Sequence, residues 1–149
     1  MKKKILSLVL AIAVFVPCMF MLVACGGGFK EGVYYKMDKV ELVCESQEVE
    51  EKLDALITLS GKTEEEFLEQ FKSDVKMIFE EGVCKGYQGE TLVGQYYYSV
   101  EDGMVVCYLT EEKTGDPIQK FKIEGNSLVF ETSYSSVTGV TIKTVYTQE

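Results

Sequence analysis

The chain of 149 residues carries a formal net charge of −9, from 24 acidic residues against 15 basic ones, and every basic residue is a lysine. A polyanion without arginine is a poor fit to nucleic acid, whose binding depends on neutralising phosphates. Histidine is absent as well, which excludes Ser-His-Asp and Cys-His catalytic arrangements.

The first 25 residues have the pattern of an export signal that is removed. Three lysines at residues 2–4 precede an apolar run from Ile5, and the run ends in Leu22-Val23-Ala24-Cys25. The run is almost long enough to span a bilayer, but the small Ala24 suits a peptidase subsite and no basic stop-transfer cluster follows. The segment resembles the signal peptide and lipobox of bacterial lipoproteins. This resemblance implies transfer of a diacylglyceryl group to the Cys25 sulfur and cleavage of the chain before this residue.

The signal divides the chain into three predicted parts. Residues 1–24 form the signal peptide, residues 25–28 the lipidated cysteine with a glycine tether, and residues 29–149 one domain with a helical insert at about 46–73. Removing residues 1–24 takes away three lysines and no acid, so anionic headgroups repel the domain and the lipid alone anchors it. We therefore expect a monomeric lipoprotein on the extracytoplasmic face of the cell membrane, with diacylglyceryl as its only added group. An uncleaved signal anchor is the alternative.

Three further cysteines, Cys44, Cys84 and Cys107, follow the lipobox. An odd number outside the cytosol does not describe a disulfide framework. Cys84 and Cys107 are predicted to lie two strands apart, about 9.6 Å by the strand spacing, which is beyond the reach of a disulfide. A bridge between Cys44 and Cys84 stays open. No zinc site is predicted, because histidine and a Cys-x-x-Cys spacing are both missing.

The domain is predicted to begin with a strand over residues 32–43 and to continue with two helices. The apolar alternation of the strand changes phase at Asp38-Lys39, which indicates a β-bulge or a break there. Ser46 is the expected N-cap of the first helix, and Thr63 with Glu66 predicts a capping box at the start of the second. The apolar stripe of the first helix comprises Val49, Leu53, Leu56 and Ile57.

From Val75 onward the apolar pattern has a period of two, as in strands. Three glycines at residues 82, 86 and 89 interrupt it, and Asp102-Gly103 is typical of a two-residue hairpin turn. Six strands are expected here, one from Val75 and the others at residues 91–100, 104–110, 118–124, 127–134 and 140–147. With the first strand they predict a mainly β fold, an antiparallel up-and-down meander of about seven strands closed into a barrel or half-barrel. A flat sheet with both helices on one face is the alternative.

Short motifs in residues 29–149 resemble the lipocalin-like small lipoproteins of Gram-positive bacteria. Gly32-Val33-Tyr34 stands where lipocalins carry Gly-x-Trp, Gly94-Gln95-Tyr96 precedes the Asp102-Gly103 turn, and Gly125-Asn126-Ser127-Leu128 enters a late strand. The chain departs from the family pattern because it has no tryptophan, and no arginine that could pack on one. The resemblance implies a lipocalin-like barrel whose calyx binds a small apolar ligand.

Tyrosines on the strands are the candidate ligand-binding residues. Tyr96 and Tyr98 share one face of their strand, whereas Tyr97 faces the other way. Aromatic rings with hydroxyl groups suit a wall that holds a small amphipathic ligand at the barrel mouth. The predicted wall consists of Tyr35, Tyr96, Tyr98 and Tyr108. The alternative is that the inward tyrosines only fill the core.

The acidic segment 41–81 is the second candidate site, since it holds 13 acidic residues and four lysines. It predicts a surface for a cationic protein, formed by Glu64, Glu65, Glu66 and Glu69; a solvated helical face is the alternative. An envelope structural barrel without a ligand is the third hypothesis. No enzyme activity is predicted, because the carboxylate pairs Glu80-Glu81 and Glu101-Asp102 fall at strand ends, where acids are usually solvated.

Replacing Cys25 by alanine tests the predicted anchor. We expect the Cys25→Ala variant to lack a lipid adduct and to leave the membrane fraction, because acyl chains on this sulfur are the only anchor proposed. Fractionation of the producing cells and mass spectrometry of the N-terminal peptide measure both effects. A variant that stays on the membrane, cleaved at the same bond and free of lipid, would contradict the lipoprotein prediction.

Overall fold

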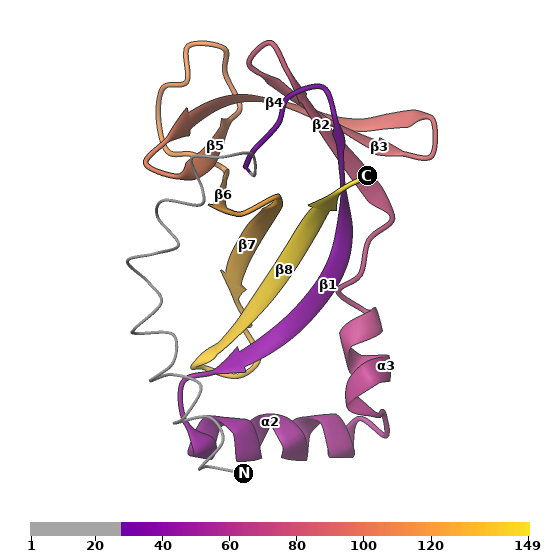
Figure 1. The fold of residues 1–149 in the computed structure, drawn as a ribbon. Coiled ribbons are helices and arrows are strands. Elements are labelled where there is room, and N and C mark those ends of the chain that lie inside the picture. Colours follow the sequence, from indigo (N-terminus) through magenta and orange to yellow (C-terminus); the bar gives the residue numbers. More distant parts are fainter. Residues whose placement is uncertain (1–27) are drawn as a thin grey trace.

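The computed structural model describes residues 28–149, so the predicted signal peptide, lipobox and Cys25 lie outside the described residues. Eight antiparallel strands form a closed barrel in which each strand pairs with the next (Figure 1). The barrel closes where β1 (Tyr34–Cys44) pairs with β8 (Val140–Gln148). Between them lie β2 (Val75–Glu80), β3 (Val83–Gln88), β4 (Thr91–Glu101), β5 (Met104–Tyr108), β6 (Gln119–Glu124) and β7 (Ser127–Ser133).

The predicted fold class, an up-and-down β-meander closed into a barrel with a helical insert after the first strand, is confirmed. The barrel has eight strands, and the additional one is β3, where the sequence pattern indicated only glycine interruptions. Gly86 lies inside β3 directly opposite Gly94 of β4, and the register shifts just after it. Glycine inside a strand often marks a bulge or a close approach of another backbone. Strand β3 therefore continues through Gly86.

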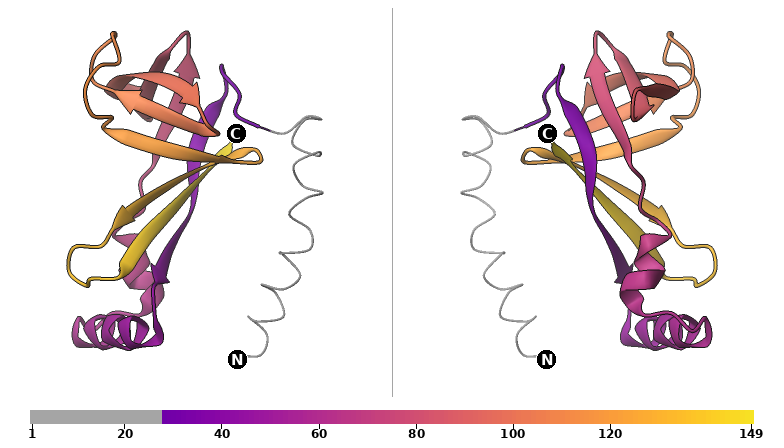
Figure 2. Two further views of the ribbon diagram at one scale, coloured as in Figure 1. Left: turned by 90° about the vertical axis from the view of Figure 1, so that its left-hand side faces the viewer. Right: turned by 90° about the vertical axis from the view of Figure 1, so that its right-hand side faces the viewer.

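The first strand is interrupted by a register shift at the place where the sequence predicted a β-bulge or a break. The register of β1 against β8 shifts between Met37 and Lys39. On the N-terminal side of the shift, the three residues Tyr34, Tyr35 and Lys36 also pair with β2. On its C-terminal side, which is the lower half of β1 in Figure 1, β1 pairs with β8 alone among the described residues. The lower halves of β1, β8 and β7 therefore project from the barrel as a three-stranded extension (Figures 1 and 2).

Two helices, α2 (Gln47–Leu59) and α3 (Glu64–Glu69), follow β1 and pack at the end of this extension. The hydroxyl of Ser46 accepts a hydrogen bond from the Val49 N–H at 3.3 Å, and Thr63 and Glu66 form the predicted capping box. The apolar faces of the helices form a small core with the start of β8 and with flanking residues. Its buried members are Leu53, Ile57, Phe67 and Val140.

The main core fills the barrel. It contains the largest fully buried side chains of the described chain and is continued by edge-to-face aromatic contacts, such as Phe79 against Tyr98 at 5.1 Å between ring centroids. Aromatic pairs of this geometry add to the free energy gained from burial. The core residues are Tyr35, Met77, Phe79, Cys84, Tyr98, Val105, Cys107, Phe121 and Leu128.

Truncation of Phe79 should strongly destabilise the barrel. Its ring is fully buried and touches those of Phe29, Tyr35, Tyr98 and Phe121. We expect Phe79→Ala to lower the free energy of unfolding by about 3–5 kcal/mol, through lost burial and a residual cavity. Urea denaturation measures it, and Leu92→Ala, at a side chain that is 49% exposed, is the control and should change stability by about 0.5 kcal/mol or less. Equal losses in the two variants would contradict the assigned core.

Candidate functional site

The segment that precedes β1 covers one end of the barrel. The ring of Phe29 lies 5.2 Å from that of Phe79, 5.8 Å from that of Tyr98 and 6.0 Å from that of Tyr35, measured between centroids. The N–H of Gly32 donates to the Phe79 carbonyl at 2.9 Å, at the end of β2. This end of the barrel is therefore closed by an aromatic side chain from residues 28–33.

Hydrogen bonds hold the same segment in place. The Lys30 N–H donates to the Tyr35 hydroxyl at 2.8 Å, and the Gln148 amide donates to the Gly28 carbonyl at 2.8 Å and to the Tyr35 hydroxyl at 3.1 Å. The Tyr98 hydroxyl donates to the Glu31 carboxylate. Burial, and then this hydrogen bond to a carboxylate, raise the pKa of the Tyr98 phenol above its ordinary value. Residues 28–33 are thus an ordered part of the fold.

A cavity of about 180 Å³ lies at the opposite end of the barrel. Its walls come from the first halves of β2 and β4 and from residues of β3, β6 and β8, and Ser73, between α3 and β2, also lines it. Most of the lining is apolar, with hydroxyl and amide groups among it. The lining residues include Val75, Met77, Cys84, Tyr96, Gln119 and Tyr146.

The four tyrosines predicted to form a ligand wall do not line one cavity. Tyr96 lines the cavity. Tyr35 and Tyr98 are buried in the core at the covered end, with their hydroxyls engaged as described. Tyr108 is opposite Tyr97 in the β4–β5 register, one residue out of phase with the inward pair Tyr98 and Cys107, so it lies on the outer face. The structure therefore places one of the four at the cavity and adds Tyr146, which the sequence pattern had assigned only to a strand face.

The three cysteines of the domain are free. Cys84 and Cys107 lie on β3 and β5, separated by β4 as predicted, and both are buried in the barrel core. Their thiols are nevertheless hydrogen-bonded to each other inside the barrel, closer than the strand spacing suggested. A hydrogen bond to the Cys107 sulfur, together with burial, raises the pKa of Cys84 far above its usual range. Cys44 lies instead beside α2, in the second core. A thiol with a raised pKa is a weak nucleophile, so Cys84 acts as a core residue.

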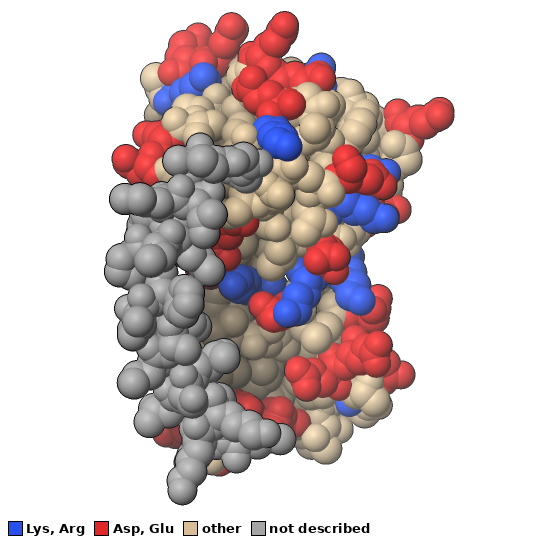
Figure 3. All heavy atoms as spheres, in the orientation of Figure 1, with Lys and Arg blue, Asp and Glu red and all other residues tan. Residues whose placement is uncertain are grey.

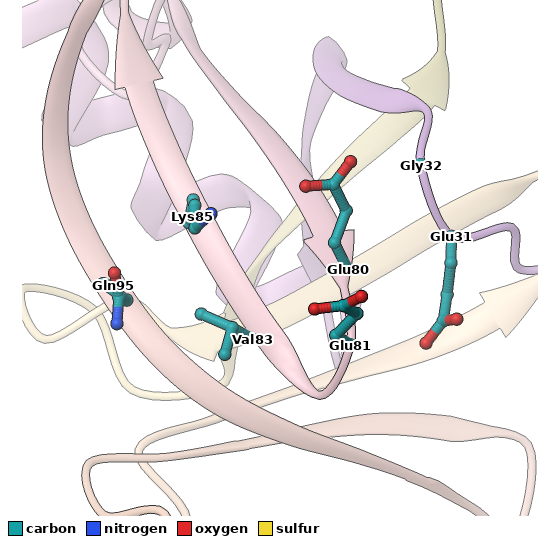
Figure 4. Close-up of a pocket in the computed structure, with 7 residues that line it drawn as sticks. All are labelled: Glu31, Gly32, Glu80, Glu81, Val83, Lys85 and Gln95. Atoms are coloured by element: carbon teal, nitrogen blue, oxygen red, sulfur yellow. The ribbon is translucent and has the colours of Figure 1, made fainter.

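A concavity of about 750 Å³ lies beside the β2–β3 turn. Figure 4 shows Glu80 and Glu81 in succession at this turn and Glu31 beside them on the segment before β1. Lys85 and Gln95 complete its wall from β3 and β4. The Glu31 carboxylate is already engaged by Tyr98. Within residues 28–149 no three acidic or cysteine side chains are arranged to hold a metal ion.

A groove of about 390 Å³ runs between β1 and the two helices. Residues 41–44 of β1 form one side, and Leu53 and Ile57 of α2 contribute apolar side chains to the other. Four carboxylates line it, from Glu41, Glu50, Asp54 and Glu64. Burial, and then the charges of Glu50 and Asp54, raise the pKa of the Cys44 thiol in this groove.

The acidic residues predicted to bind a cationic protein have separate surroundings. Only Glu64 lines the groove. The Glu66 carboxylate accepts the Thr63 N–H at 2.9 Å in the capping box, and Glu69 forms an ion pair with Lys72. Glu65 is exposed on α3. The other groove acids were not among the predicted site residues, although Glu50 and Asp54 are spaced four residues apart and lie within one turn of the buried Leu53.

Comparison of the chain with protein-family models, with curated proteins and with solved structures returned no match. Among residues 28–149 no helix combines the length and the apolar character needed to cross a bilayer.

The Tyr98–Glu31 contact predicts a pH dependence of stability. Because the pKa of Tyr98 is raised in the folded protein, the unfolded chain loses the phenol proton first as the pH passes about 10. The free energy of unfolding should therefore fall above about pH 10, and Tyr98→Phe should make that fall shallower, since its unfolding no longer releases this proton. Urea denaturation across the alkaline range measures the slope. Identical slopes for the two proteins would contradict the assignment.

Proposed function

We propose that this protein is a membrane-anchored extracytoplasmic binding module that holds the apolar part of a small amphipathic ligand at the mouth of its barrel. The observation that carries the proposal is the difference between the two barrel ends. Phe29 covers one end, whereas the other contains a cavity with an apolar lining. A closed base and an open, mostly apolar mouth with a few polar groups are the features of a small-molecule site.

The size of the cavity limits the ligand. About 180 Å³ is less than the ~300–1,000 Å³ of pockets that enclose a drug-sized molecule. A short alkyl chain or a single ring fits such a volume, and the remainder of the ligand then stays outside. Gln119 and Ser73 at the cavity wall supply an amide and a hydroxyl group for its polar part. An amphipathic molecule with a short apolar end is therefore the class that suits the site.

The proposed anchor gives the domain an orientation. Cys25 precedes Gly28 by three residues, which reach about 10 Å when extended, and Gly28 is bound at the covered end of the barrel by Gln148 and Asn126. Lipidation of Cys25 would therefore hold the covered end toward the bilayer. The mouth, α2 and α3 would then face away from the membrane, where a ligand arrives from the aqueous phase.

A cavity-filling substitution tests the proposal. Native mass spectrometry of a chain beginning at residue 26 would detect a co-purified ligand, and calorimetric titration with octyl glucoside below its micelle concentration would measure binding. We expect Val75→Phe, which places a ring at the cavity, to weaken this binding at least about tenfold. Val100→Phe is the matched control, because Val100 is 50% exposed and does not line the cavity. Absence of both a co-purified ligand and octyl glucoside binding would favour the ligand-free envelope protein instead.

A further inference from the structure

The lower half of β1 has a free edge. Pairing with β2 ends at Lys36, while pairing with β8 continues from Lys39 to Cys44. In an antiparallel strand, alternate residues direct their backbone N–H and C=O groups to opposite sides. Over residues 39–44 half of these groups therefore face away from β8, and no described strand receives them. Such an edge is a template for an added strand.

The acidic groove lies along this free edge. It is lined by residues 41–44 of β1 and by both helices, and by no residue of β8. The groove has a volume of about 390 Å³, and the chain that leads from α3 to β2 does not fill it. This chain crosses β1 nearer the barrel, where the Ser73 N–H contacts the Met37 sulfur at 3.3 Å. Figure 1 shows α3 beside the lower half of β1. An extended segment thus has both an edge to pair with and room to lie in.

The charge of the groove selects what can enter. Four acidic residues and no lysine are among the residues that line it. Glu41 forms an ion pair with Lys39, and in residues 28–149 neither Glu50, Asp54 nor Glu64 has an ion-pair partner. On the face drawn in Figure 3, lysines gather over the middle of β1 and β8, and acidic side chains gather beyond them at both ends. Charge complementarity favours a basic segment at the helical end and disfavours an acidic one.

We propose that the free edge of β1 between Lys39 and Cys44 binds an extended basic peptide segment of a partner protein as an additional β-strand. Backbone hydrogen bonds to the edge supply the pairing, and alternate lysine or arginine side chains face the carboxylates of α2 and α3. Val43, which is 48% exposed, offers an apolar contact to an intervening side chain. This site is separate from the barrel cavity, and the proposal does not depend on ligand binding there.

The test uses three matched peptides and the full-length protein in phosphatidylcholine nanodiscs, with empty nanodiscs as the blank. The first is fluorescein-labelled Lys-Val-Lys-Val-Lys-Val, with alternating basic and apolar residues. The second has the same sequence with alternate backbone amides N-methylated, which removes strand hydrogen bonds and keeps the charge. The third carries Glu in place of Lys. Fluorescence anisotropy measures each dissociation constant.

We expect binding of the first peptide, a loss of at least about tenfold for the N-methylated one, and no binding of the acidic one. Glu50→Gln with Asp54→Asn should weaken binding at least about threefold at low salt, with a smaller effect at high salt. The control pair Glu48→Gln with Glu51→Gln removes the same charge from the same helix, α2, outside the groove and should leave the affinity unchanged.

Several outcomes would overturn the proposal. Equal binding of the N-methylated peptide would show attraction by charge without strand addition, and equal effects of the two variant pairs would place the peptide elsewhere. No binding of the first peptide would also overturn it, as would a dimer of the protein that buries the β1 edge in the absence of peptide. Val75→Phe should leave peptide affinity unchanged, so failure of the barrel-cavity site and failure of this one are distinguishable.

Discussion

The pairing of β1 with β8 is the constraint on which the rest of the structure depends. It runs from Tyr35 opposite Gln148 to Cys44 opposite Val140 and converts a meander into a closed barrel. Within the barrel itself, closure removes the edges that an open sheet would expose. It also positions the aromatic rings of β1, β2 and β4 around one interior, because an inward residue on each strand is then surrounded by all the others.

The same pairing explains why the molecule has two distinct ends. The ladder of β1 with β2 ends at Lys36, whereas its ladder with β8 continues to Cys44, so the lower half of β1 pairs with β8 and not with β2. The apolar faces of α2 and α3 pack against this extension. The covered end is aromatic and tightly hydrogen-bonded, whereas the helical end carries a groove and a cavity mouth. Both proposed binding sites therefore lie on the side opposite the segment that would lead to the membrane.

Local sequence signals predicted local structure well and distances between segments poorly. The bulge after Met37, the capping box at Thr63 and the turn at Asp102-Gly103, where both residues have positive φ, follow from short-range chemistry. Strand β3 was missed because a glycine inside a strand and a glycine in a turn look alike in sequence. The inward position of Tyr108 was wrongly expected because a strand's face depends on its register with its neighbours.

By itself, the sequence determined the β-meander, the helical insert and the acidic character of the helices, because periodicity, caps, turn residues and charge are written in neighbouring positions. Only the tertiary structure decided which carboxylates converge. Glu41 of β1, Glu50 and Asp54 of α2 and Glu64 of α3 line the same groove. The free edge of β1 beside them exists because the β1–β2 and β1–β8 ladders end at different residues. Neither relation has a local signal, since each depends on where separate elements stop pairing in space.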